Sequence, residues 1–175
     1  MSTIRKRVDM AIDDEDEGND LEQLGIGAGF QQELHTMLSS IQLLKEFDMG
    51  EIEEIAPYTG AYLARKGVKI FREGAKGSFM CLIVDGGVEI IKGGKKVTTV
   101  RPGKTMGEMA VIDGYPHSAT AIAVEDTRLI MITRNQLDNM SERHPRLAIK
   151  LLKRLAILMS LRLRQTTGVL CDYLD

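Results

Sequence analysis

Apolar positions recur at helical spacing in the first third of the chain. They stand three or four positions apart: Leu34, Met37, Leu38, Ile41 and Leu44. This is the repeat of an amphipathic helix. Further along, Asp48 is followed three residues later by Glu51, the spacing of a side-chain cap at a helix start. The pattern predicts helical structure over residues 31–56, with a second short helix beginning after Asp48.

The middle of the chain changes to short apolar runs rich in β-branched residues. The runs are Val68–Phe71, Phe79–Val84, Val88–Ile91, Val97–Val100, Thr120–Val124 and Arg128–Ile132. Glycine-containing turns such as residues 85–87 and 92–94 separate them, which is typical of strands. Strands this short cannot bury both faces in an open sheet, so we expect a small barrel or double-sheet jelly roll over about residues 60–133.

Helical spacing returns after residue 132. Asn135–Met140 predicts a short helix, and Pro145 suits the first turn of a long helix that runs to about Gln165. The apolar band on this long helix is wider than a single surface stripe requires. We therefore expect one part of the band to pack on the β-roll and the rest to pack on another partner.

Composition and charge are those of an ordinary globular protein, with 43% hydrophobic and 27% charged residues and a net charge of −2. Seven carboxylates crowd into residues 13–22, and residues 1–29 carry little apolar periodicity. We expect residues 1–29 to form a disordered acidic tail and residues 30–170 to form one domain. Cys81 and Cys171 form no C-x-x-C pair, and no leader or membrane span is evident, so the chain is interpreted as cytoplasmic with free thiols.

The segment from Gly107 to Thr120 is the most informative part of the chain. Its pattern predicts a strand exit, a short helical turn, a turn at Gly114 and Pro116, and entry into the next strand. Backbone amides at such a helix start, together with His117, Ser118 and Thr120, would form a nest for an anion. From the residues alone, a purely structural turn remains the alternative.

This segment resembles the phosphate-binding cassette of cyclic-nucleotide-binding domains, as in the catabolite activator protein and the regulatory subunits of cyclic-nucleotide-dependent kinases. The residues that match the family pattern are Gly107, Glu108, Ala110, Pro116, Ala119 and Thr120. The resemblance covers about residues 38–165. It implies a mainly β fold with flanking helices: a double-stranded β-helix, or jelly roll, with N-terminal helices and a long C-terminal helix.

The resemblance also implies roles for individual residues. Glu108 would accept a hydrogen bond from the ribose 2′-hydroxyl, and Ser118 would contact the phosphate or a guanine amino group. Backbone amides near Met109, Ala110 and Ala119 would meet the cyclic phosphate and ribose. The predicted ligand is cAMP or cGMP, without a metal, and the predicted binding residues are Gly107, Glu108, Met109, Ala110, Pro116, His117, Ser118, Ala119 and Thr120.

His117 departs from the family pattern, which has an arginine at this position. A guanidinium offers a permanent charge and a bidentate fork, whereas imidazole titrates near pH 6.5 and donates once from each edge. Losing a charge-assisted contact to a buried phosphate costs about 2–4 kcal/mol, or roughly 30- to 1000-fold in affinity. The sequence therefore leaves open weak nucleotide binding, another ligand, or a cassette that has stopped binding nucleotide.

Other function classes find little support in the sequence. The chain has no catalytic triad elbow, and its three histidines lack metal-ligand spacing, so we expect no catalysis. Only ten residues follow Gln165, too few for the DNA-binding unit of the family's activators. The expected function is a regulatory sensor that signals through its C-terminal helix.

The long C-terminal helix also carries an expectation about assembly. The resemblance implies a homodimer formed by parallel pairing of this helix, and one seam of three-and-four spacing on it comprises Leu152, Leu155, Met159 and Leu163. The alternative function is a degenerate fold that serves as a dimerisation module or docks a protein partner.

Overall fold

A computed structural model describes residues 20–24 and 28–174 of the chain. Ahead of the β-roll lie strand β1 (Glu22–Gln23), helix α1 (Ala28–Ser39), the 3-10 turns η1 (Gln42–Leu44) and η2 (Ala56–Tyr58), and, between these turns, helix α2 (Met49–Ile55). Asp48 and Glu51 cap α2 reciprocally, each side chain bonding the other residue's backbone N–H at 2.9 Å. The predicted second helix start is thus confirmed.

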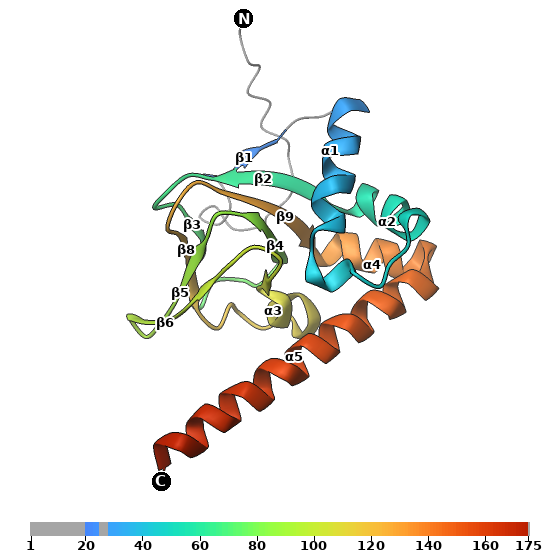
Figure 1. Cartoon of the computed structure of the whole chain (residues 1–175). Helices are drawn as coiled ribbons and strands as arrows, with labels where there is room; N and C mark the ends of the chain where they lie inside the picture. Colours follow the sequence, from blue (N-terminus) through green and yellow to red (C-terminus); the bar gives the residue numbers. More distant parts are fainter. Residues whose placement is uncertain (1–19, 25–27, 175) are drawn as a thin grey trace, which may run out of the picture.

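Eight strands lie between residues 60 and 133, the range predicted for the β-roll, and six of them correspond to the predicted runs. They are β2 (Gly60–Ala64), β3 (Lys69–Phe71), β4 (Phe79–Asp85), β5 (Val88–Lys92), β6 (Lys95–Val100), β7 (Thr105–Met106), β8 (Thr120–Ala123) and β9 (Thr127–Thr133). With β1 they form two antiparallel sheets, in the orders β1-β2-β9-β4-β7 and β3-β8-β5-β6 (Figure 1). The expected mainly β fold with flanking helices is confirmed.

Strand β4 explains why its sequence is apolar throughout. Successive side chains of a strand point to opposite faces, and both faces of β4 are covered. Phe79, Cys81 and Ile83 lie in the core between the two sheets. Met80 and Leu82 face the helices on the outer side. The molecule therefore has two cores that share one sheet.

Helices α4 (Arg134–Arg143) and α5 (Pro145–Leu174) follow the β-roll. The first half of α5 packs into the helical core through Leu147, Ala148, Leu151 and Leu155. Lys150 donates to both carboxylate oxygens of Glu51 at 2.6 and 2.8 Å. The helix extends beyond the predicted end at Gln165 and projects away from the body (Figure 1). No helix in the described ranges is long and apolar enough to cross a membrane.

Strands β1, β2 and β7 were absent from the predicted runs. β7 and β1 contain only two residues each, too few to show a period. β1 falls within the segment predicted to be a disordered tail, and it pairs with the edge of β2 while Glu22 accepts a hydrogen bond from Arg65 at 3.1 Å. Residues 1–19 and 25–27 of that predicted tail lie outside the described residues.

Candidate functional site

The cassette segment folds as a short helix between two glycines. Helix α3 (Glu108–Asp113) begins after Gly107, whose φ of 77° lies in the left-handed region that favours glycine. A Cβ on Gly107 would lie 3.0 Å from the Phe79 carbonyl oxygen and 3.3 Å from the imidazole of His117. The backbone can therefore approach strand β4 closely only because this residue lacks a side chain, and this approach places α3 at the end of the sheet.

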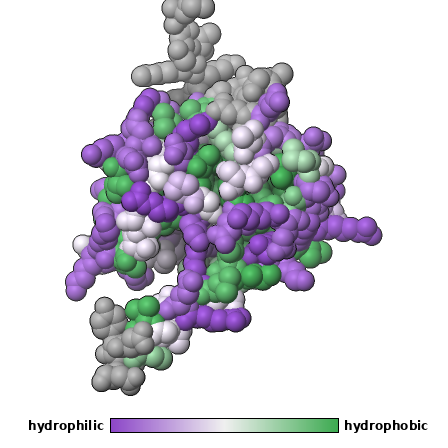
Figure 2. Space-filling view, viewed as in Figure 1, coloured by the Kyte–Doolittle hydropathy of each residue, from purple (hydrophilic) through white to green (hydrophobic). Residues whose placement is uncertain are grey.

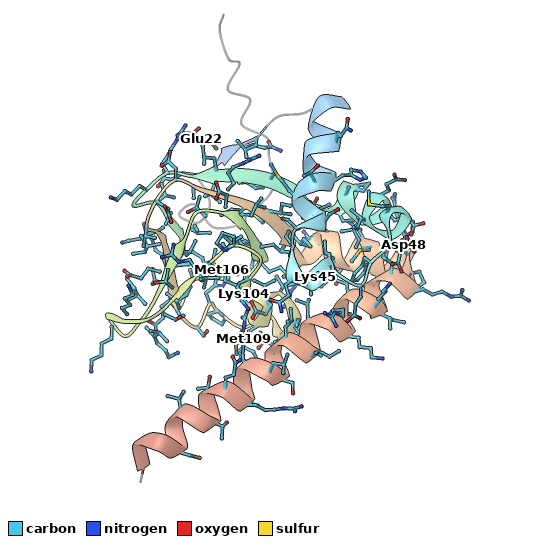
Figure 3. All side chains as sticks on the ribbon, in the orientation of Figure 1. Glu22, Lys45, Asp48, Lys104, Met106 and Met109 are labelled. Atoms are coloured by element: carbon cyan, nitrogen blue, oxygen red, sulfur yellow. The ribbon has the colours of Figure 1, made fainter. Side chains whose placement is uncertain are left out.

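A cavity of about 660 Å³ lies beside α3. Strands β6 and β7, helix α3, the entry to β8 and the second half of α5 contribute to its wall. Figure 3 labels three of the lining residues, Lys104, Met106 and Met109. Seven of the predicted binding residues line the cavity: Gly107, Glu108, Met109, Ala110, His117, Ser118 and Ala119.

The other two predicted binding residues lie outside the cavity lining. Pro116 belongs to the turn before β8 and is exposed. The Thr120 hydroxyl accepts a hydrogen bond from the Glu73 backbone N–H at 2.9 Å. Thr120 thus ties the cassette to the segment that contains Glu73, and neither Pro116 nor Thr120 is among the residues that line the cavity.

Glu108 is the buried acid of the site. Its side chain is only 6% exposed, and one carboxylate oxygen forms an ion pair with Arg162 of α5. The guanidinium of Arg162 also donates to the carbonyl and hydroxyl oxygens of Thr105, at 2.6 and 2.9 Å. The second carboxylate oxygen, Oε2, is buried and has no hydrogen-bond partner within the described part of the chain. A buried acceptor of this kind is costly unless a ligand donates to it.

His117 occupies a different environment from the one the sequence suggested. It is 2% exposed, and its ring stacks on Phe71 at 4.1 Å with an interplanar angle of 9°. Its ring also meets the Phe79 ring at 5.5 Å and 62°. Burial disfavours the imidazolium and lowers the pKa of His117 to about 4. At neutral pH the residue is therefore an uncharged aromatic group at the edge of the cavity, which corrects the expected pKa near 6.5.

Helix α5 closes the far side of the cavity with residues absent from the predicted site. Arg162, Gln165, Thr166 and Val169 all line it. These positions are spaced i, i+3, i+4 and i+7, so they share one helix face. The signal was present in the sequence as this mostly polar face on an otherwise apolar helix, but only the fold shows that it meets the cassette.

The predicted dimer residues do not lie on one free face of α5. Leu155 is 0% exposed within the chain's own helical core, so it has no surface left for a partner and is removed from the predicted seam. Leu152 and Met159 are half-buried, and Leu163 is 69% exposed. The exposed apolar residues of the same helix include Ile157 and Leu161. Figure 2 shows hydrophobic surface where α5 leaves the body.

Metal chemistry has no candidate site among the residues that the structure describes. No group of three or more His, Cys, Asp or Glu side chains is arranged to hold an ion there. The chemical character of the cavity is thus that of a mixed pocket, with one buried carboxylate, two lining cations at Lys104 and Arg162, and several hydroxyl groups.

Comparisons with known proteins agree with this geometry. Residues 63–144 match the family described as cyclic nucleotide-binding domain. The chain is 32% identical over 120 residues to the cyclic AMP receptor protein of Thermus thermophilus, covering 66% of this chain and 54% of that protein. It is 28% identical over 95 residues to a cAMP-dependent protein kinase regulatory subunit of Debaryomyces hansenii, covering 54% of this chain and 21% of that protein.

A solved structure matches most of the fold. The crystal structure of a cyclic nucleotide-binding domain from Methylobacillus flagellatus superposes with a TM-score of 0.76 at 29% identity, covering 87% of this chain and 89% of that one. The two curated relatives are longer, since this chain spans about half of one and about a fifth of the other. The family match at residues 63–144 covers most of the β-roll and helix α4.

Proposed function

Because residues 63–144 belong to the cyclic nucleotide-binding domain family, we propose that this chain is a regulatory sensor that binds cAMP or cGMP in the cavity beside α3. It acts by binding and not as an enzyme. Its place of action is the cytoplasm, where a sensor of such a ligand would meet it. The ligand's ribose faces Glu108, and its phosphate faces the backbone of residues 107–110 and 118–119.

The observation that carries this proposal is the buried Oε2 of Glu108, which has no hydrogen-bond partner among the described residues. A ribose 2′-hydroxyl is a neutral donor of the right size to satisfy one buried carboxylate oxygen while the other keeps its ion pair with Arg162. Hydrogen bonds to a charged group contribute about 1.5–3 kcal/mol each. The base then lies toward Thr166 and Val169 of α5, which line the same cavity.

The same contacts supply a route for the signal. Helix α5 is held by its first half in the helical core and by Arg162 at the cassette. A ligand that bonds Glu108 and touches α5 changes how firmly the second half of the helix is held. A ligand shifts a conformational equilibrium only by its differential affinity for the two states, so Glu108 and Arg162 are where that difference arises.

A thermal-shift screen followed by calorimetry tests the proposal. A ligand at 100 times its dissociation constant adds about 2.7 kcal/mol to stability, which is easily detected. We expect cAMP or cGMP to raise the melting temperature and the non-cyclic 5′-monophosphates to have a smaller effect. Absence of any shift and of any binding heat with both cyclic nucleotides would contradict the sensor function.

A second candidate function is favoured by the free apolar face of α5. Ile157 and Leu161 stand four residues apart on one face and are 40% and 47% exposed, which suits a second copy of this helix. In this reading the chain is a homodimeric interaction module, or docks a protein partner, whether or not nucleotide binds. Replacing both residues with glutamate should convert a dimer to a monomer in sedimentation velocity. A wild-type chain that is already monomeric at micromolar concentration would exclude the dimer.

A further inference from the structure

A bound cyclic nucleotide needs a positive group near its phosphate, and the cassette does not supply one. His117 is stacked and buried against Phe71. Of the two cations that line the cavity, Arg162 already bonds Glu108 and Thr105. The other, Lys104, donates to Gln42 of η1 at 3.1 Å. Both cations are therefore already engaged by groups of the protein.

Strand β5 places a third cation beside Ser118 and Ala119. Val88 is buried between the sheets and Ile90 lines the cavity, so alternation puts Lys92 on the same face. Ile91 is paired with Thr120 in β8, which places Lys92 next to Ala119 in the continuing register. Its ammonium donates to the Ser118 carbonyl oxygen at 2.8 Å. Ser118 and Ala119 both line the cavity.

The turn after Lys92 fixes this position. Gly93 and Gly94 have φ values of 55° and 76°, the two left-handed residues of a tight hairpin turn. The Glu73 carboxylate lies close by, but it accepts a hydrogen bond from the Gly93 backbone N–H at 2.9 Å. Within the described residues, no carboxylate lies at ion-pair distance from Lys92. Its charge is therefore available to a ligand.

We propose that Lys92 supplies the positive charge for the ligand phosphate that an arginine at position 117 would otherwise provide. This inference rests on the proposed function and assigns a binding residue to β5, outside the cassette. An ammonium group has three donors, so Lys92 can keep its bond to the Ser118 carbonyl and donate to a phosphate oxygen. Its flexible stem allows the ammonium to shift when the ligand enters.

The test is calorimetric titration of the full chain with cAMP and with cGMP in three variants. Lys92→Met removes the charge and keeps most of the stem, and we expect binding at least about tenfold weaker. Lys92→Arg keeps the charge and should bind within about threefold of the wild type. Lys69→Met is the matched control, because Lys69 pairs with Ile122 on the outer face of the same sheet and should leave affinity unchanged.

Salt gives a second readout that a merely structural role would not move. The wild-type affinity should fall as salt rises, because a phosphate–ammonium contact near the surface is screened, and Lys92→Met should flatten that dependence. If the wild type binds and Lys92→Met behaves like Lys69→Met, the Lys92 role is overturned while the sensor function stands. If the wild type binds neither nucleotide, the sensor function fails, and the Lys92 role fails with it.

Discussion

The two ends of the cassette segment, residues 107–120, are built on opposite physical principles. At one end Glu108 is a buried charge, compensated by Arg162 and tied through it to Thr105. At the other end His117 is a buried neutral ring, held by Phe71 and Phe79. Both residues come from one short segment of sequence, and both are nearly inaccessible to solvent.

The difference shows that a cassette motif does not determine the electrostatics of its pocket. A buried carboxylate is costly unless a cation or hydrogen-bond donors compensate it, and here the cation comes from α5. A histidine has no such requirement, because it can lose its proton and behave as an aromatic side chain. The Glu108 end is thus coupled to the C-terminal helix, and the His117 end is coupled to the core between the sheets.

The largest effect should come from removing the charge at the Glu108 end. Glu108→Gln keeps the shape but loses the charge-assisted bonds to Arg162 and to the ribose, so cyclic nucleotide affinity should fall about 100-fold. Titration calorimetry measures this change. Glu125→Gln, which alters an exposed acid paired with Arg101 at 3.2 Å, is the control and should bind normally. Equal affinity of Glu108→Gln and Glu125→Gln would show that the charge of Glu108 does not contribute to binding.

Adding a charge at the His117 end should have the next largest effect. His117→Arg introduces a permanent bidentate donor and should tighten binding about tenfold. His117→Phe preserves the aromatic stack and should bind within about threefold of the wild type, because the neutral ring contributes little charge. Both affinities come from the same titrations. A large loss of affinity in His117→Phe would mean that the imidazole itself holds the ligand.

A smaller effect is expected from the hydroxyl of Ser118, which directly follows His117. Ser118→Ala removes one neutral hydrogen bond to the ligand, worth about 1 kcal/mol, so affinity should fall about fivefold. Competition between cAMP and cGMP then reports whether the hydroxyl meets the phosphate or a guanine amino group. A loss confined to cGMP indicates the amino group, and an equal loss indicates the phosphate. No loss with either nucleotide would remove Ser118 from the binding residues.

The smallest effect concerns the pH dependence of stability. The pKa of His117 is lowered to about 4 in the folded chain, from 6.5 when unperturbed, so the unfolded chain binds more protons between these values. The contribution of His117 to the free energy of unfolding is therefore fully present above about pH 6.5 and is lost as pH falls toward 4. Denaturant titrations over this range should give free energies of unfolding for wild type and His117→Phe that converge at neutral pH and separate in acid. Parallel curves would contradict the neutral buried state.

The affinity for the ligand should also depend on the protonation of His117, but it should rise, and not fall, in acid. A bound phosphate favours the imidazolium and raises the pKa of His117 above its free-state value, so affinity should increase only as pH falls toward that raised pKa. Near neutral pH the affinity should be nearly independent of pH.

The sequence predicted the fold well because its periods are strong. The change from helical to alternating spacing placed the β-roll within residues 60–133, and the Asp48 cap placed α2. The cassette segment identified seven residues of the cavity wall. These features depend on local pattern, which a single sequence displays.

The contacts that the sequence could not predict join residues that are far apart along the chain. Arg162 meets Glu108 across 54 positions, and no local pattern reveals such a pair. Phe71 belongs to β3 and stacks on His117, which lies in the turn before β8. The sequence alone therefore did not show the burial that lowers the pKa of His117. Leu155 matched a dimer seam by spacing alone, yet it packs inside the domain because α5 also serves as a core helix.

The position of the two thiols offers a direct test of the proposed response of α5 to ligand. Cys81 is enclosed in the core between the sheets, whereas Cys171 is exposed in the last turns of α5. A thiol-reactive dye or spin label would therefore attach to the projecting end of the helix in the unmodified chain. Cys171 thus provides a native reporter position, from which an optical or magnetic signal would follow the helix as ligand enters.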